Sequence, residues 1–127
     1  MTLCVIGSLR DNQRMQEIAS ELRSRGHRVI LPIDASEGRM VERTTAKREF
    51  MKSMFAKIQS CDSVLAVNDV PRGGIEGYIG PNTFLQLGMA MALEKPMFAL
   101  KKWDYRLPYA EELDAMGIGL LDIRLPF

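Results

Sequence analysis

The sequence predicts an α/β fold, a three-layer doubly wound sandwich of the flavodoxin or Rossmann-like kind. Short continuous apolar runs alternate along the chain with segments whose apolar residues recur at helical spacing. Strands separated by helices pair in parallel through right-handed crossovers, and the expected strand order is 2-1-3-4-5. Because no linker, repeat or low-complexity tract interrupts this alternation, residues 1–127 are expected to form a single domain.

The first strand and helix are clearly marked. The apolar run Leu3–Ile6, closed by Gly7, has the composition of a strand that is buried on both faces. Asp11 or Asn12 can cap the helix that follows, and Gly26 is suited to end it. The segment therefore predicts a buried strand leading directly into an amphipathic helix.

A second strand and helix are expected next. The strand is predicted over residues 28–32, and the polar stretch 34–46 is expected to be a loop that enters a helix. That helix is predicted over about residues 45–60. Its apolar face is marked by four residues, Met51, Met54, Phe55 and Ile58.

The third strand, predicted over residues 63–67, opens into the glycine-rich stretch 68–80. A helix is expected from Pro81, since proline is favoured in a first helical turn, and it must stop before Pro96. A fourth strand is expected over residues 97–100. The last two expected elements are a short helix and a weak strand, over residues 109–116 and 120–123.

Composition and charge exclude several classes of function. The chain carries 17 basic and 16 acidic residues, a net charge of +1. It therefore lacks the excess of positive charge that is typical of proteins that bind nucleic acid polymers or anionic membranes. Cys4 and Cys61 are expected to be reduced, buried thiols, and the single histidine, His27, disfavours histidine triads and metal sites. The apolar start Met1–Ile6 is too short for a signal peptide or membrane span, so we expect a cytoplasmic location.

The topology predicts where a ligand binds. In open parallel sheets the site lies beyond the carboxyl ends of the strands where the winding reverses, here between strands one and three. The loop Gly7-Ser8-Leu9-Arg10 joins strand one to a helix and offers a hydroxyl, a guanidinium and a helix N-terminus. It is expected to bind a phosphate or carboxylate, although glycine and serine are common in any such turn.

The second loop of this expected site runs through the glycine-rich stretch to the next helix. Tyr78 can stack on a base, while Asn82 and Thr83 can bond sugar hydroxyls or a phosphate. Asn68 and Gly80 complete the expected substrate-binding residues. The competing interpretations are a flexible surface connection and, for Thr83, simple helix capping.

Four segments within residues 3–100 carry a family resemblance: Gly7–Arg10, Cys61–Asn68, Gly77–Thr83 and Leu87–Pro96. With these segments the chain resembles the nucleoside 2-deoxyribosyltransferase family, a superfamily that includes nucleoside 5′-monophosphate N-glycosidases. The resemblance implies a doubly wound fold in a homodimer or higher homo-oligomer, with a nucleoside or nucleotide as the small-molecule partner and no metal or organic cofactor. It also implies a glutamate nucleophile that attacks the anomeric carbon, and an aspartate that assists departure of the base.

Both implied carboxylates are replaced in this chain. The nucleophile position falls on Gln86, a natural difference or a change introduced to trap a ligand, and the aspartate position falls on Met54. A carboxamide is a poor nucleophile and carries no charge to stabilise a developing cation. Three nearby carboxylates are possible substitutes, but each is expected to be a solvated surface charge: Glu49, Asp69 and Glu76.

Three functions therefore remain open from the sequence. The first is a deoxyribosyltransferase-like transferase or hydrolase, acting on or binding the N-glycosidic region of a nucleoside or nucleotide, with impaired covalent catalysis. The second is a non-catalytic module that senses a nucleotide through the same pocket, with Gln86 bonding the ribose. The third is a phosphoribohydrolase of the lysine-decarboxylase-like type, which Gly73-Gly74 ahead of a threonine-bearing helix faintly suggests.

Overall fold

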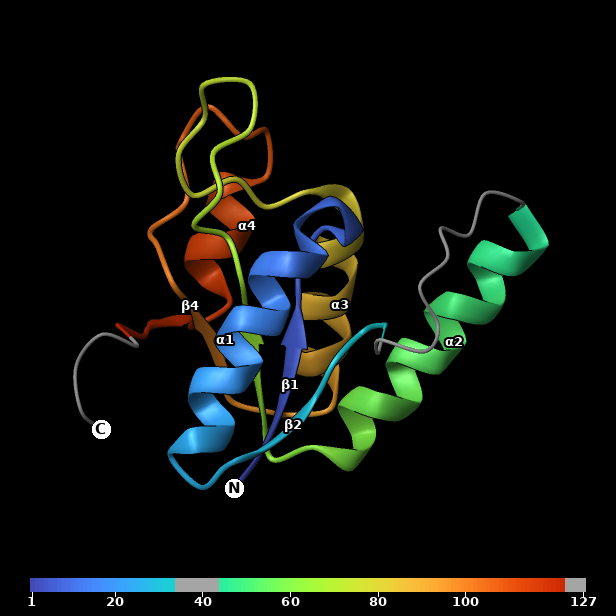
Figure 1. Cartoon of the computed structure of the whole chain (residues 1–127). Coiled ribbons are helices and arrows are strands. Elements are labelled where there is room, and N and C mark those ends of the chain that lie inside the picture. The colour runs from blue at the N-terminus through green and yellow to red at the C-terminus, as the bar shows by residue number, and fades with distance from the viewer. Residues whose placement is uncertain (34–43, 123–127) are drawn as a thin grey trace.

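A five-stranded parallel sheet forms the centre of the computed structural model, which describes residues 1–33 and 44–122 (Figure 1). The strand order is β2-β1-β3-β4-β5, which confirms the predicted topology. The strands are β1 Thr2–Ile6, β2 Arg28–Ile30, β3 Ser63–Ala66, β4 Met97–Ala99 and β5 Gly119–Leu120. The helices are α1 Asn12–Ser24, α2 Thr44–Ser60, α3 Pro81–Ala92 and α4 Ala110–Ala115, with a 3₁₀ turn, η1, over Leu9–Asp11.

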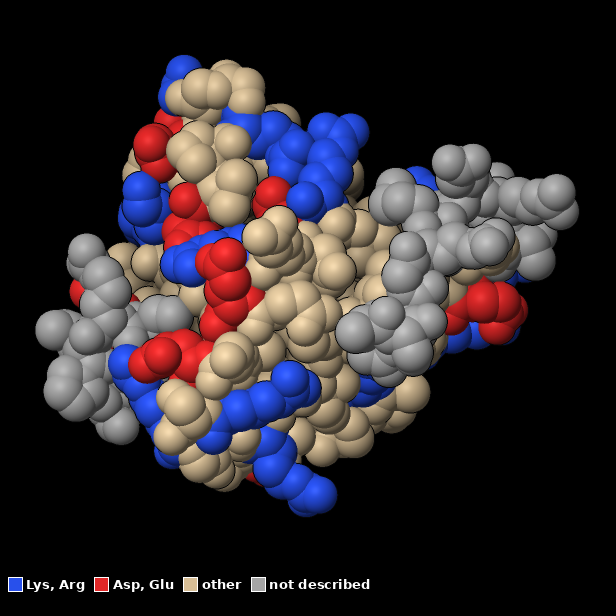
Figure 2. Space-filling view, in the orientation of Figure 1, with Lys and Arg blue, Asp and Glu red and all other residues tan. Residues whose placement is uncertain are grey.

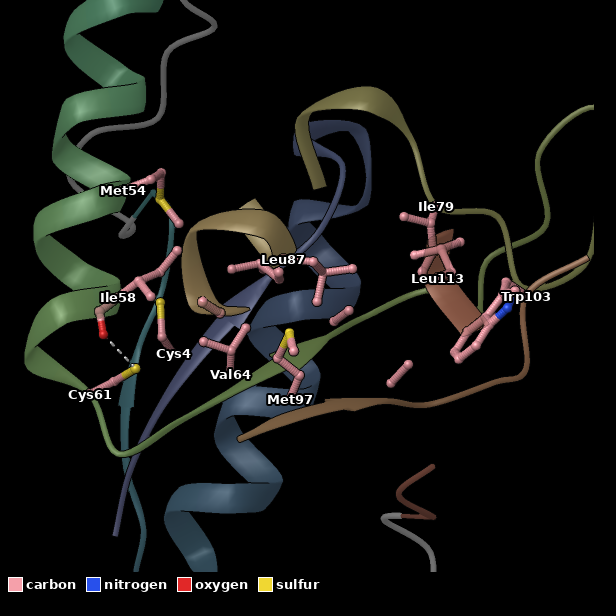
Figure 3. Close-up of a cluster of buried hydrophobic side chains, with 14 of the residues drawn as sticks. Cys4, Met54, Ile58, Cys61, Val64, Ile79, Leu87, Met97, Trp103 and Leu113 are labelled. Carbon is pink, nitrogen blue, oxygen red and sulfur yellow. Dashed lines mark hydrogen bonds between the residues drawn. The ribbon is translucent and has the colours of Figure 1, made fainter. Parts of the chain in front are cut away.

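The two faces of the sheet bury separate apolar clusters, because successive side chains of a strand point to opposite faces. Leu3 and Val5 of β1 pack against the apolar stripe of α1. Cys4 and Ile6 join a larger cluster with side chains of α2, α3 and α4 (Figure 3). The central strands β1 and β3 are thus covered on both sides, and the third layer of the sandwich is α1.

Helices α2 and α3 each expose some apolar side chains. In α2, Met54 is fully buried as expected, but Phe55 is 38% exposed. In α3, Leu85 and Met91 are exposed, while Gln86 is buried. The face of α3 that points inward therefore carries two polar side chains, Thr83 and Gln86, in the first half of the helix. Of the expected loop 34–46, residues 34–43 lie outside the described residues.

Both cysteines are free and buried, as expected. The Cys61 thiol donates to the carbonyl oxygen of Ile58 at 3.0 Å, at the end of α2 (Figure 3). Side-chain hydrogen bonding between the two thiols raises the pKa of Cys4, to which burial adds, and lowers the pKa of Cys61 to about 7.

Two loops at the carboxyl edge of the sheet are locked together. The buried side chain of Asn68, two residues after the end of β3, donates to the Lys101 carbonyl at 2.8 Å. It accepts from the amides of Leu100 and Lys101 at 3.1 and 3.0 Å. Gly77 has a φ of +64° and faces the Lys102 carbonyl. The loops that follow β3 and β4 consequently project together at the top of Figure 1.

Gly77→Ala is expected to lower the free energy of unfolding by about 2–4 kcal/mol, from a strained positive φ and overpacking together. A Cβ at this position would lie 2.1 Å from the Lys102 carbonyl oxygen. Gly73→Ala is the matched control, because Gly73 also has a positive φ but meets nothing within 4 Å, and its cost is expected to be about 1–2 kcal/mol. Urea unfolding followed by the single tryptophan measures both, and equal losses would contradict the proposed loop contact.

Candidate functional site

A cavity of about 220 Å³ lies at the carboxyl edge of the sheet, where the chain leaves β1 and approaches α3. Its lining comes from the β1–α1 connection, α2, the glycine-rich loop and the start of α3. The lining residues are Gly7, Ser8, Leu9, Arg10, Lys47, Phe50, Arg72, Tyr78, Gly80, Pro81, Asn82, Thr83 and Gln86. The structure therefore brings together the expected site residues except Asn68, whose side chain bonds the backbone of the neighbouring loop instead.

The β1–α1 connection is shaped by Gly7 and Ser8. A Cβ on Gly7 would lie 3.1 Å from both the Met15 sulfur and the Val67 carbonyl, so the tight approach of strand and helix favours glycine. The Ser8 hydroxyl accepts from the Arg10 amide at 3.3 Å and caps η1. This turn leaves the Arg10 side chain exposed at the cavity.

A tight hairpin turn positions Arg72. Arg72 and Ile75 exchange two backbone hydrogen bonds of 3.1 and 3.0 Å, and both glycines between them have positive φ. A Gly-Gly pair suits such a two-residue turn because both central positions need a positive φ. The Arg72 guanidinium bonds Asp11 at 3.0 Å and lies 6.0 Å from the centre of the Tyr78 ring. The glycine-rich loop is thus an ordered element that presents a cation to the cavity.

The three carboxylates considered as substitutes are all engaged with cations. Asp69 accepts from Arg14 at 2.7 and 3.0 Å through two guanidinium nitrogens, and this hydrogen bonding raises the pKa of Arg14. Glu76 pairs with Lys101 at 2.8 Å. Glu49 lies on an exposed part of α2, 3.7 Å from Lys52. None of these three lines the cavity.

The start of α3 supplies the deepest polar groups. Gly80 is extended and precedes Pro81, so the helix begins at the cavity wall as predicted. Thr83 and Gln86 follow one helical turn apart, and both are buried. Gln86 is only 4% exposed, and its Oε1 has no hydrogen-bond partner among the described residues.

The lining has a pronounced charge imbalance. It contains three cationic side chains, Arg10, Lys47 and Arg72, and no carboxylate among the described residues. Figure 2 shows basic side chains beside the loops in the upper part of this face, while acidic and basic side chains are interspersed below. The cavity therefore favours an anion, although the whole chain is nearly neutral.

Comparison with known proteins places the chain in a family. The family model described as nucleoside 2-deoxyribosyltransferase matches residues 6–117. The chain belongs to the nucleoside 2-deoxyribosyltransferase family. A comparison with curated proteins gave no match.

Solved structures of low sequence identity share this deoxyribosyltransferase-family fold. A CMP N-glycosidase, BcmB, from Clostridium botulinum has 15% identity and a TM-score of 0.57, over 95% of this chain and 88% of that chain. A 2-deoxyribosyltransferase from Bacillus psychrosaccharolyticus has 16% identity and a TM-score of 0.58, over 78% and 71%. The protein BlsM has 14% identity and a TM-score of 0.66, over 97% and 82%. At these identities the likeness establishes the fold.

Four lining residues of the cavity were not among the expected site residues: Lys47, Phe50, Arg72 and Pro81, the last of which was expected only to start the helix. Lys47 and Phe50 continue, at helical spacing, the stripe that buries Met54, so extending that stripe toward the start of α2 would have found them. Arg72 reaches the cavity because the hairpin turn and its ion pair with Asp11 hold it there. An ion pair between residues so far apart in the sequence leaves no local sequence pattern.

A smaller apolar recess adjoins the cavity on the α2 side. It shares Phe50 and Gln86 with the main cavity and adds Met51 and Leu85.

Within the described ranges no helix is long and apolar enough to cross a membrane. Nor do three or more histidine, cysteine or acidic residues gather there as they would to hold a metal ion. The cavity and the recess together thus present cationic side chains, apolar side chains and the buried amide of Gln86.

Proposed function

We propose that this protein binds a nucleoside 5′-monophosphate in the cavity above β1 and β3 and is impaired in the covalent glycosyl transfer of its family. One observation carries the proposal. The described lining holds three cationic side chains and a buried carboxamide, Gln86, but no carboxylate. These groups suit binding of an anionic nucleotide far better than they suit cleavage of its N-glycosidic bond.

The cations supply the phosphate site. Arg10 and Arg72 offer guanidinium forks, and Lys47 offers a compact ammonium group. The N-terminus of α3, with Asn82 exposed at the cavity, adds the partial positive charge of unpaired backbone amides. Asp11 pairs with Arg72 from outside the lining and holds the guanidinium in place.

The chemistry of glycosyl transfer also supports impaired catalysis. Glycosyl transfer passes through an oxocarbenium-like centre, which a carboxylate stabilises and attacks. An amide at position 86 does neither, and the nearby cations disfavour a second positive charge. Met54, at the position of the assisting aspartate, is fully buried in the core and cannot donate a proton to a leaving base.

The protein is therefore expected to release no base above background from nucleosides or their monophosphates. Gln86→Glu is expected to give slow release, because the variant regains a nucleophile but still lacks the proton donor. Free base is measured by chromatography after incubation with a panel of ribo- and deoxyribonucleosides and their monophosphates. Rapid turnover by the unmodified protein would contradict the proposed impairment.

Lys47→Ala and Arg72→Ala are each expected to weaken binding of a nucleoside monophosphate about 10-fold to 100-fold, the range for a lost charge-assisted hydrogen bond. Binding of the corresponding nucleoside should change much less. Lys52→Ala is the matched control, because Lys52 lies on α2 but outside the cavity lining. Isothermal titration measures all three, and an equal loss for nucleoside and monophosphate would contradict a phosphate role.

We also propose a homo-oligomer formed through α2 and α3. Phe55 is 38% exposed on α2, and Leu85 is 44% exposed on α3. Met51 and Leu85 line the apolar recess, so this exposed surface is continuous with the site. A second copy of the chain covering the surface would close the recess as well as bury the side chains.

Leu85→Glu is expected to shift the protein to a monomer, because a charge would be buried at the interface. Leu120→Glu is the control, since Leu120 is also exposed but lies on β5, the strand at the far edge of the sheet. Sedimentation velocity measures the mass of both variants. An unmodified protein that is monomeric at all concentrations would overturn the proposed oligomer.

A further inference from the structure

We infer that Gln86 makes this site selective for ribonucleotides over 2′-deoxyribonucleotides. The inference rests on the proposed function, in which a nucleoside monophosphate occupies the cavity with its sugar at α3. It goes further because it specifies that the sugar is a ribose and that the Gln86 amide recognises it. Gln86 lines both the main cavity and the adjoining apolar recess, so its amide lies where these two spaces meet.

The Gln86 amide is buried with an unpaired oxygen, so a ligand that donates a hydrogen bond to this oxygen would be favoured. The side chain is 96% buried, with 4% exposed, and its Oε1 has no hydrogen-bond partner among the described residues. A buried polar atom without a partner costs free energy, and native structures rarely leave one unmatched. An occupant of the cavity that presents a donor at this depth removes that cost.

The chemistry of a nucleotide narrows the choice of donor. A phosphate dianion carries no hydrogen to donate, and its charge places it with Arg10, Lys47 and Arg72. A sugar hydroxyl both donates and accepts, so it can pair with either end of a carboxamide. The amino and ring N–H donors of the bases differ from one nucleotide to the next, whereas the sugar hydroxyls are common to all of them, so we assign the Gln86 amide to the ribose.

Stereochemistry then selects one hydroxyl. The family resemblance puts the nucleophile at position 86, and a nucleophile that displaces the base attacks the anomeric carbon from the side opposite the base. The 2′-hydroxyl of a β-ribonucleotide is on the adjacent carbon and on that same face. A 2′-deoxyribonucleotide has hydrogen there, and Gln86 would stay unpaired or hold a water in its place.

Titration calorimetry with matched pairs tests the inference directly. CMP, UMP, AMP and GMP are compared with their 2′-deoxy counterparts, and at least one ribonucleotide is expected to bind about 10-fold to 100-fold more tightly than its partner. An arabinonucleotide monophosphate, whose 2′-hydroxyl lies on the face of the base, is expected to bind like the deoxy compound. This third ligand separates recognition of the correct face from a general preference for hydroxyls.

Two variants assign the selectivity to Gln86. Gln86→Leu, of similar size and without polar atoms, is expected to bring the ribonucleotide down to the affinity of the deoxyribonucleotide and leave the latter nearly unchanged. Lys47→Ala is the control, expected to weaken both ligands equally because both carry the phosphate. Thermal unfolding of each variant confirms that it is folded, and the affinity ratio of the unmodified protein decides the question if Gln86→Leu does not fold.

The outcomes separate the inference from the proposed function. Equal affinity for ribo- and deoxyribonucleotides, or equal affinity for ribo- and arabinonucleotides, overturns the role of Gln86 while the nucleotide site stands. Selectivity that persists in Gln86→Leu also overturns it. No binding of any monophosphate by the unmodified protein overturns the proposed function and the inference together.

Discussion

The lock between the loops that follow β3 and β4 is the interaction on which the site depends. The Asn68 side chain bonds three backbone groups of residues 100–101, and Gly77 admits the Lys102 carbonyl at close range. The segment so fixed carries Arg72 and Tyr78 to the cavity. A long loop would otherwise have to lose its conformational freedom when the ligand binds, and here folding has already removed it.

The electrostatics of the cavity arise from how neighbouring carboxylates are used, and not from an excess of basic residues. The chain has almost equal numbers of acidic and basic groups. Asp69 and Glu76 nevertheless form ion pairs that hold the loop against α1 and the β4 connection, away from the lining. Asp11 pairs with Arg72, but it too lies outside the lining. A nearly neutral protein of this family therefore presents cations, and no carboxylate among the described residues, to the cavity.

Sequence reasoning succeeded where the signal is local. The apolar runs of β1 and β3 and the proline at the start of α3 predict those elements, and the topology predicts the edge of the sheet at which the cavity is found. It failed where a side chain's role depends on a distant partner. Asn68 follows a strand at the correct edge, yet the β4 loop occupies its hydrogen-bonding groups, and Arg72 enters the cavity through pairing with Asp11. The pattern also could not show that α3 exposes Leu85 and buries Gln86.

The Arg72–Asp11 ion pair links a loop to the segment that starts α1, while the cavity wall opposite it is α3. Helices α1 and α3 lie on different faces of the sheet. An anion held by Arg10 and by the N-terminus of α3 would therefore connect the two outer layers of the sandwich across the edge of the sheet. A ligand that binds there would raise the melting temperature of the protein, by mass action on the folded state, to a degree that depends on the ligand concentration.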